Sequence, residues 1–300
     1  MAKQFTFASD YKHVEAIIPV PAFLEASDGC QLAYFVHHAA NQQPTTSVML
    51  FYHGGGAYQV GVYQQMAYAL AAGHGITSYL FDIRGHGASA GERGDAPSVE
   101  RVMLDVQEAV AFVQAKHPQG ALFLAGHSSG CGLLLNAQQQ GYIKSVAGLI
   151  FIAPFLGADS KTALQSDFIK TVRVWPFIWH GITGWGTHTP AVYFNYPATM
   201  RVHSPHLLDY YTVGMALAVT PKHADACLKD ISLPLHIIVG KNDLQISSQA
   251  FLAMRDAHEL APATELRVLS DVGHFSVLGV ASDVIATAIS MSGLSASKQS

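Results

Sequence analysis

The chain has 300 residues, of which half are hydrophobic and only 13% are charged, and its formal net charge at pH 7 is −4. A chain of this length forms one large domain or two small ones and buries about three-quarters of its unfolded surface. The composition predicts a compact protein with a heavily buried sheet and argues against a disordered chain. No block of lysine and arginine is present, so we expect neither nucleic acid nor an anionic membrane surface as a partner.

The cysteine spacing and the first ten residues indicate in which cellular compartment the protein is expected. Cys30, Cys131 and Cys227 are widely spaced and follow neither a disulfide nor a metal-binding pattern, which is typical of a reducing environment. Residues 1–10 lack the basic region and apolar core of a signal peptide. We therefore expect a cytoplasmic protein.

Local patterns also argue against a membrane span and a metal site. The longest apolar run, residues 146–158, is far too short to cross a bilayer, so we expect no stable membrane insertion. The histidine pairs His37-His38 and His203/His206 have no supporting cysteine or acidic cluster, so we expect no bound metal ion.

The first predicted elements form a hairpin. Apolar runs at residues 14–23 and 31–36 are separated by Asp28-Gly29, a pair typical of the turn between antiparallel strands. This hairpin precedes the regular part of the chain.

From residue 47 onward, short apolar runs alternate with longer segments of helical spacing. Apolar positions in residues 99–113 recur at helical intervals, with Pro97-Ser98 opening and His117-Pro118 closing the predicted helix. This alternation predicts a mostly parallel sheet that helices cover on both faces. The predicted strands of this part comprise residues 47–52, 76–81, 121–125, 146–152, 235–239 and 264–269.

Residues 154–220 interrupt the alternation and hold all three tryptophans, Trp175, Trp179 and Trp185. An insertion at this point lies over the carboxyl edge of a parallel sheet, where such sheets bind ligands. We interpret it as a mostly helical cap on a core formed by residues 1–153 and 221–300. We expect the three tryptophans to line an apolar substrate pocket; the alternative is that the cap aromatics only pack the cap against the core.

The pentapeptide Gly126-His127-Ser128-Ser129-Gly130 directly follows the predicted strand 121–125 and precedes a helix-compatible stretch, residues 131–140. A serine at such a strand-to-helix turn projects its hydroxyl from the top of the sheet, and the flanking glycines permit the sharp turn. Serine- and glycine-rich turns are common, but this context indicates that Ser128 is a nucleophile.

A serine nucleophile needs a histidine base, and the base needs an orienting acid. Asp243 lies in the loop after strand 235–239, and His274 lies in the loop after strand 264–269. The chain order Ser128, Asp243, His274 is that of nucleophile, acid and base in an α/β sheet. These three residues are the predicted catalytic triad.

Each role has an alternative. Asp271 is closer in sequence to His274 than Asp243 is, but a residue three positions away in one loop rarely faces the ring correctly. His127 adjoins the serine on the turn itself, and His86 lies in another loop, where a structural role is expected.

The reaction also needs two backbone N–H groups for the oxyanion of the tetrahedral intermediate. Ser129, next to the nucleophile, should supply one. The other should come from the glycines after strand 47–52, where we select Gly55, with Gly54 and Gly56 as alternatives.

In combination, these motifs resemble those of α/β-hydrolase-fold serine hydrolases. Residues 81–95, FDIRGHGASAGERGD, are similar to a loop of the monoacylglycerol lipase/lysophospholipase-like branch, which also includes serine aminopeptidases. The resemblance implies a mostly parallel central sheet flanked by helices, a cap inserted after the sixth core strand, and a carboxylic ester substrate. The triple glycine is similar to the hormone-sensitive-lipase-like branch, but that branch usually has an acidic residue before the serine, where His127 stands here, and an N-terminal cap.

The predicted function is that of a serine carboxylic-ester hydrolase acting through an acyl-enzyme, with no metal or organic cofactor. Its partner would be a small-molecule ester with an apolar acyl group. One alternative is an aminopeptidase or amide hydrolase, which would need a cap carboxylate for the substrate amine; the cap offers Asp159, Asp167 and Asp209. Another is a non-catalytic ligand-binding protein of the same fold. Gly85-x-Gly87 does not fit a dinucleotide-binding motif, and dehalogenase chemistry would need a carboxylate in place of Ser128.

Overall fold

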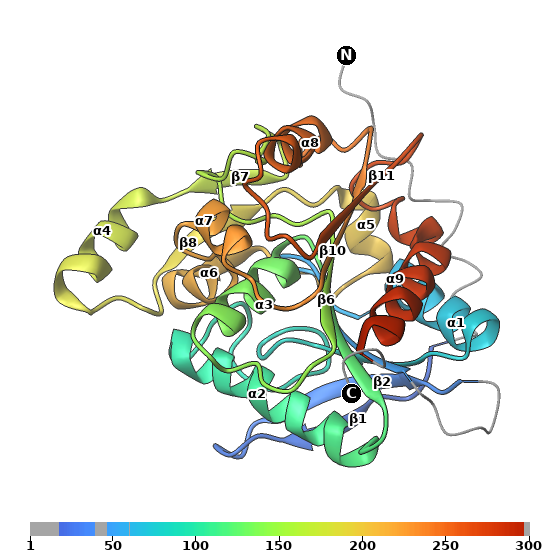
Figure 1. The fold of residues 1–300 in the computed structure, drawn as a ribbon. Helices are drawn as coiled ribbons and strands as arrows, with labels where there is room; N and C mark the ends of the chain where they lie inside the picture. The colour runs from blue at the N-terminus through green and yellow to red at the C-terminus, as the bar shows by residue number, and fades with distance from the viewer. Residues whose placement is uncertain (1–17, 40–46, 60, 297–300) are drawn as a thin grey trace.

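The computed structural model describes residues 18–39, 47–59 and 61–296. An eight-stranded sheet with the order β1-β2-β4-β3-β5-β6-β10-β11 forms its centre (Figure 1). β1 and β2 form the antiparallel hairpin at one edge, β2 pairs antiparallel with β4, and the other neighbours are parallel. The strands comprise Ala22–Glu25 (β1), Gln31–His37 (β2), Ser47–Tyr52 (β3), Thr77–Phe81 (β4), Ala121–His127 (β5), Gly148–Ile152 (β6), Leu235–Gly240 (β10) and Thr264–Leu269 (β11).

The predicted α/β-hydrolase fold is thus confirmed. All six strands predicted from residue 47 onward are present, with ends that differ by at most two residues from those expected. The hairpin is also present, but its first strand begins only at Ala22, and residues 14–17 of the predicted run lie outside the described residues.

Helices cover both faces of the sheet because its strands are apolar on both sides. In β3, Leu50 packs into one hydrophobic cluster and its neighbours Met49 and Phe51 pack into the other, as the two-residue period of a strand requires. α1 (Val62–His74) and α9 (Ala281–Ala296) lie side by side on one face, whereas α2 (Val99–Lys116), α3 (Ser129–Gln139) and α8 (Ser248–Asp256) lie on the other.

α2 follows its sequence signals closely. The Ser98 side chain caps the helix by accepting a hydrogen bond from the Arg101 N–H, and the helix ends at Lys116, before His117. Its buried face includes Val102, Val106 and Val113.

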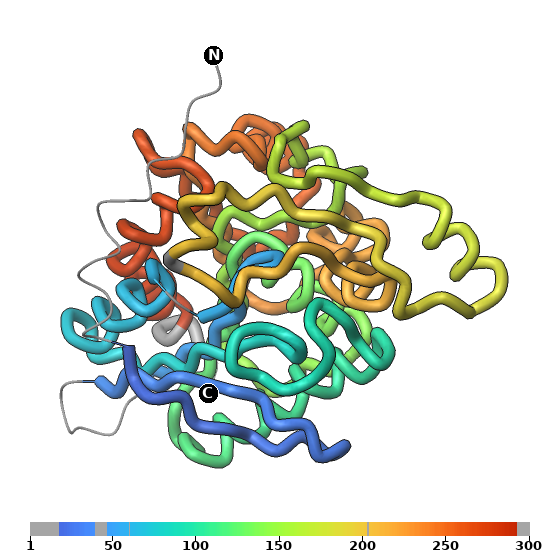
Figure 2. Tube along the Cα trace, turned by 180° about the vertical axis from the view of Figure 1, so that it is seen from behind, coloured from blue at the N-terminus to red at the C-terminus, as the bar shows by residue number. Residues whose placement is uncertain are grey.

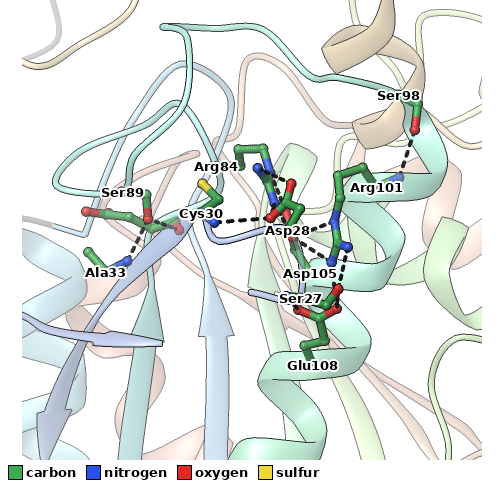
Figure 3. A network of polar contacts seen from close by, with 11 residues as sticks. Ser27, Asp28, Cys30, Ala33, Arg84, Ser89, Ser98, Arg101, Asp105 and Glu108 are labelled. Atoms are coloured by element: carbon green, nitrogen blue, oxygen red, sulfur yellow. Dashed lines mark hydrogen bonds and ion pairs between the residues drawn. The ribbon is translucent and has the colours of Figure 1, made fainter. Parts of the chain in front are cut away.

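A buried ion network joins α2 to the loop after β4 (Figure 3). The guanidinium of Arg84, only 4% exposed, donates two 2.7 Å hydrogen bonds to Asp105 of α2 and also contacts Asp28 at the hairpin turn. Arg101 contacts the same Asp105 carboxylate and Glu108. Moving Arg84 away from Asp105 would leave an uncompensated buried charge, which is costly. The network therefore holds the start of the loop at Arg84 in place.

The cap follows the sixth strand, as expected, but it is not purely helical. It contains a small antiparallel sheet in the order β7-β8-β9 between its helices. The strands are too short and too interrupted by helices to give a clear periodicity in the sequence. The elements between β6 and β10 are β7 (Ile169–Val172), α4 (Val174–Thr183), β8 (Pro190–Phe194), α5 (Ala198–His203), β9 (Tyr210–Thr212), α6 (Val213–Val219) and α7 (Ala224–Lys229).

α4 projects from the body of the molecule, as both views show (Figures 1 and 2). The helix has no buried residue. No helix in the described part of the chain combines the length and the apolar character needed to cross a membrane.

Candidate active site

Ser128 lies on the sharp turn between β5 and α3, with φ 53° and ψ −121°. This is a strained backbone conformation for a residue with a side chain, of a kind found at functional sites. The flanking glycines allow close packing: a Cβ on Gly126 would lie 2.6 Å from the Gly130 carbonyl carbon, and a Cβ on Gly130 would lie 2.6 Å from the His53 carbonyl oxygen.

The structure brings together the three residues predicted as a triad. His274 Nε2 lies 3.0 Å from Ser128 Oγ, and His274 Nδ1 lies 2.8 Å from Asp243 Oδ2. All three side chains are buried. The other carboxylate oxygen, Asp243 Oδ1, accepts hydrogen bonds from the N–H groups of Gln245 and Ile246, so the carboxylate is held with Oδ2 toward the ring.

The alternatives for base and acid lie elsewhere. Asp271 is exposed, and no hydrogen bond joins it to His274 among the described residues. His127 binds the His274 carbonyl oxygen at 2.9 Å through Nε2 and the Tyr63 hydroxyl at 2.9 Å through Nδ1. His127 therefore supports the backbone of His274 and does not face Ser128 Oγ.

Three buried histidines surround the Gly54–Gly56 loop, and each binds a backbone carbonyl. His53 Nδ1 binds the Gly54 oxygen, His86 Nδ1 binds the Arg84 oxygen, and His127 Nε2 binds the His274 oxygen. A carbonyl only accepts hydrogen bonds, so each of these nitrogens carries the proton. The second nitrogen of each ring is then an acceptor.

Two tyrosines use these acceptor nitrogens. Tyr63 donates its hydroxyl proton to His127 Nδ1 and accepts from the Gly54 N–H at 3.1 Å. Tyr211 donates to His86 Nε2 and accepts from the Gly56 N–H at 2.7 Å. The N–H groups of both outer glycines are therefore engaged.

Gly55 is left as the loop's available donor. Among the described residues, no group accepts a hydrogen bond from its N–H. The Gly55 N–H shares a peptide unit with the Gly54 carbonyl, which His53 binds at 2.9 Å. In a trans peptide the N–H points away from the carbonyl oxygen. A Cβ on Gly55 would lie 3.2 Å from Ser129 Oγ, which places this residue against the serine turn.

Ser129 begins α3, and the first N–H groups of a helix have no partner within it. Both predicted oxyanion donors thus lie beside Ser128, and Gly55 and Ser129 line the same cavity as the serine. Gly55 is favoured over Gly54 and Gly56 because Tyr63 and Tyr211 already bind the N–H groups of those two glycines. The sequence motif did not identify these tyrosines.

The cavity has a volume of about 490 Å³, which is in the range of small-molecule sites. Among the described residues, its lining includes no charged side chain. Its aromatic side chains come mainly from the cap and comprise Phe155, Phe168, Phe177, Phe194 and Tyr211.

The structure does not bring the three cap tryptophans to this cavity. Trp175, Trp179 and Trp185 are 69%, 51% and 77% exposed, and none lines the cavity. Trp175 and Trp179 are four residues apart and share one face of α4, whereas Phe177 lies on the opposite face, toward the cavity. The expectation that the tryptophans line the pocket is therefore corrected in favour of Phe177.

None of the three cap carboxylates lines the cavity. Asp159 and Asp167 are exposed, and Asp209 pairs with Arg201 at 2.7 Å. No group of three or more histidine, cysteine or acidic side chains in the described chain could hold a metal ion.

Burial lowers the pKa of His53 to about 4, and burial also holds the pKa values of His86 and His127 well below the usual range. As the pH falls below about 6.5, these three histidines become protonated in the unfolded chain but stay neutral in the folded protein. Burial acts oppositely on Asp82, because it raises the pKa of that carboxyl to about 6 and favours folding as the pH falls.

We expect the free energy of unfolding to be highest above pH 6.5 and to fall between pH 6.5 and 5, because more histidines have lowered pKa values than carboxyls have raised ones. Urea unfolding at several pH values measures this. Glutamine cannot be protonated, so the free energy of unfolding of His86→Gln should fall less steeply with decreasing pH, by the uptake of about one proton fewer. Equal stability at pH 7 and 5 would contradict neutral buried histidines.

Comparison with known proteins agrees with this fold. Residues 43–274 match the family model described as Hydrolase_4: Serine aminopeptidase, S33. The structure superposes on a soluble variant of monoglyceride lipase from Saccharomyces cerevisiae in complex with a substrate analog, with a TM-score of 0.73 and 17% identity, covering 93% of this chain and 97% of that one.

Two curated relatives align over 241 residues. The monoglyceride lipase of Rattus norvegicus is 28% identical, and the alignment covers 78% of this chain and 77% of the lipase. The uncharacterized protein YnbC of Escherichia coli (strain K12) is 25% identical over 77% of this chain, but the chain spans only 40% of that protein. Since the family model covers residues 43–274, which is most of the chain, this chain belongs to the Hydrolase_4 (serine aminopeptidase, S33) family of α/β-fold hydrolases.

Proposed function

We propose that this protein hydrolyses carboxylic esters with an apolar acyl group through a covalent acyl-enzyme on Ser128. The observation that carries the proposal is the Ser128–His274–Asp243 chain of hydrogen bonds, at 3.0 and 2.8 Å, beside a cavity whose lining, in the described part of the chain, includes no charged side chain. The monoglyceride lipase names of several relatives support an ester as the substrate.

In the first half of the reaction, Ser128 Oγ attacks the ester carbonyl carbon while His274 Nε2 takes the serine proton. Asp243 accepts from His274 Nδ1–H, which holds the ring in the required tautomer and stabilises the imidazolium. The carbonyl oxygen becomes an oxyanion that the N–H groups of Gly55 and Ser129 bind. The intermediate collapses, and His274 donates its proton to the departing alkoxide, which leaves as the alcohol.

In the second half, a water molecule attacks the acyl-enzyme and His274 accepts its proton. Collapse of the second tetrahedral intermediate breaks the bond to Ser128 Oγ, which recovers a proton from His274, and the carboxylic acid leaves. Every step uses side-chain and backbone groups of this chain, so the proposal requires no cofactor.

The cavity favours esters over peptides with a free amino terminus. A protonated amine buried without a carboxylate partner would be strongly disfavoured, and Asp159, Asp167 and Asp209 do not line the cavity. An apolar acyl chain, by contrast, gains free energy on leaving water for such a lining. The lining therefore favours an ester over the substrate of an aminopeptidase.

The triad is tested by comparing two conservative carboxylate variants. Asp243→Asn should lower kcat roughly 10⁴-fold, because an amide nitrogen at Oδ2 would favour the wrong histidine tautomer, and Asp271→Asn is the matched control that should retain activity. Ser128→Ala should lower kcat on the order of 10⁶-fold and abolish labelling by a fluorophosphonate probe. Persistent labelling of the alanine variant, or greater damage from Asp271→Asn, would refute the assignment.

The acyl pocket is tested with p-nitrophenyl esters of increasing chain length. Each buried methylene should raise kcat/KM by up to about fourfold, corresponding to about 0.8 kcal/mol, until the cavity is full. Phe177→Ala should lower kcat/KM several-fold for octanoate but not for acetate, whereas Trp179→Ala, on the exposed face of the same helix, should leave the trend intact. Equal rates for acetate and octanoate, or faster cleavage of aminoacyl-nitroanilides, would contradict an acyl pocket.

A further inference from the structure

Two tyrosines of the cap bind the glycine loop, residues 54–56, that lies beside Ser128. Tyr211 of β9 accepts a hydrogen bond from the Gly56 N–H at 2.7 Å. Tyr196, which follows β8, donates its hydroxyl proton to the Gly55 carbonyl at 2.5 Å. Both tyrosines are buried, and burial raises the pKa of each, so both remain protonated.

The two tyrosines hold opposite ends of a single peptide unit, because the Gly55 carbonyl and the Gly56 N–H belong to the same planar group. The preceding peptide unit, which carries the Gly55 N–H, has its carbonyl held by His53. Gly55 joins the two units, so holding both peptide planes restricts the φ and ψ angles of Gly55 and the freedom of its N–H to turn. The direction of this donor therefore depends on the core through His53 and on the cap through Tyr196 and Tyr211.

The cap makes two further contacts with the loop. The Leu208 N–H donates to the Gly56 carbonyl at 2.9 Å. Gly56 has φ 66°, and a Cβ there would lie 2.8 Å from the Phe194 ring, so this glycine is needed for the cap to approach. Phe194 packs against Tyr211 with the ring centroids 4.8 Å apart and also lines the cavity.

The hydroxyl of Tyr211 is itself oriented from the core. Its proton goes to His86 Nε2 at 2.7 Å, and His86 is fixed by its Nδ1–H bond to the Arg84 carbonyl. Arg84 is held by the buried Asp105 carboxylate. The Tyr211 oxygen thus presents a lone pair to the Gly56 N–H rather than competing with it as a donor.

We propose that Tyr196 and Tyr211 are positioning residues that hold the oxyanion loop in its active geometry, so that docking of the cap sets the rate of the chemical step as well as enclosing the substrate. This inference rests on the proposed serine hydrolase function. The cap then affects both substrate binding and the rate of the chemical step. Its apolar lining binds the acyl chain, and its two tyrosine hydroxyls orient the Gly55 donor.

The test removes one hydroxyl at a time. Tyr211→Phe and Tyr196→Phe should each lower kcat for p-nitrophenyl acetate about 10- to 100-fold with little change in KM, since misplacing one oxyanion donor chiefly affects the transition state. Tyr210→Phe is the matched control: Tyr210 lies next to Tyr211 on β9, no hydrogen bond of its hydroxyl is found among the described residues, and its variant should keep the wild-type kcat.

Two further readouts separate positioning from a general loss of structure. The inhibition constant of an alkyl trifluoromethyl ketone, whose adduct carries an oxyanion, should rise across the variants in proportion to the fall in kcat/KM. The double variant should lose less than the product of the single losses, because both hydroxyls hold the same peptide unit. Circular dichroism and thermal unfolding establish that each variant is folded.

The outcomes also separate this inference from the proposed function. If the wild-type protein and Tyr210→Phe hydrolyse the acetate ester and folded Tyr196→Phe and Tyr211→Phe do so equally well, the cap does not position the loop. A selective rise in KM, with kcat and ketone inhibition unchanged, would likewise overturn the inference. If the wild-type protein neither hydrolyses esters nor reacts with the fluorophosphonate probe, the proposed function itself fails.

Discussion

In the proposed mechanism, catalysis depends on the orientation of one peptide N–H group, that of Gly55. Glycine loops have no preferred orientation of their own, so the direction of this donor must come from hydrogen bonds to the neighbouring peptide groups. Tyr63 binds the Gly54 N–H and Tyr211 binds the Gly56 N–H. His53 binds the Gly54 carbonyl, which belongs to the same peptide unit as the Gly55 N–H. Among the described residues, no group accepts a hydrogen bond from the Gly55 N–H, and Gly55 lines the same cavity as Ser128.

Buried neutral histidines make this arrangement possible. Each ring combines one N–H and one acceptor nitrogen, so it can bind a carbonyl on one side and receive a tyrosine or backbone proton on the other. Tyr63–His127 and Tyr211–His86 repeat this pattern on the two flanks of the loop. His127 also holds the His274 carbonyl, so the glycine loop and the predicted base are supported by one connected network. Burial in turn keeps these rings neutral by lowering the pKa of each.

Much of the fold could be predicted because its signals are local. The strands are continuous apolar runs, and the serine turn and the loops bearing Asp243 and His274 each follow a strand directly, so chain order alone places them at one edge of the sheet. The support of the loop could not be predicted in this way. Tyr211 and Gly56 are 155 residues apart, and nothing near Tyr211 distinguishes it from Tyr210. The prediction for the tryptophans of α4 was wrong because aromatic composition does not say which face of a helix lies toward the cavity. Phe177 lines the cavity, whereas Trp179, two residues later, is exposed.

A crystal structure of the protein with an alkyl trifluoromethyl ketone tests the central claim most directly. The account predicts a covalent bond from Ser128 Oγ to the ketone carbon, with the resulting oxyanion about 3 Å from the N–H groups of both Gly55 and Ser129 and the alkyl chain in the cavity lined by Phe177 and Phe194. An adduct whose oxygen faces away from Gly55, or a ketone bound without a bond to Ser128, would contradict it.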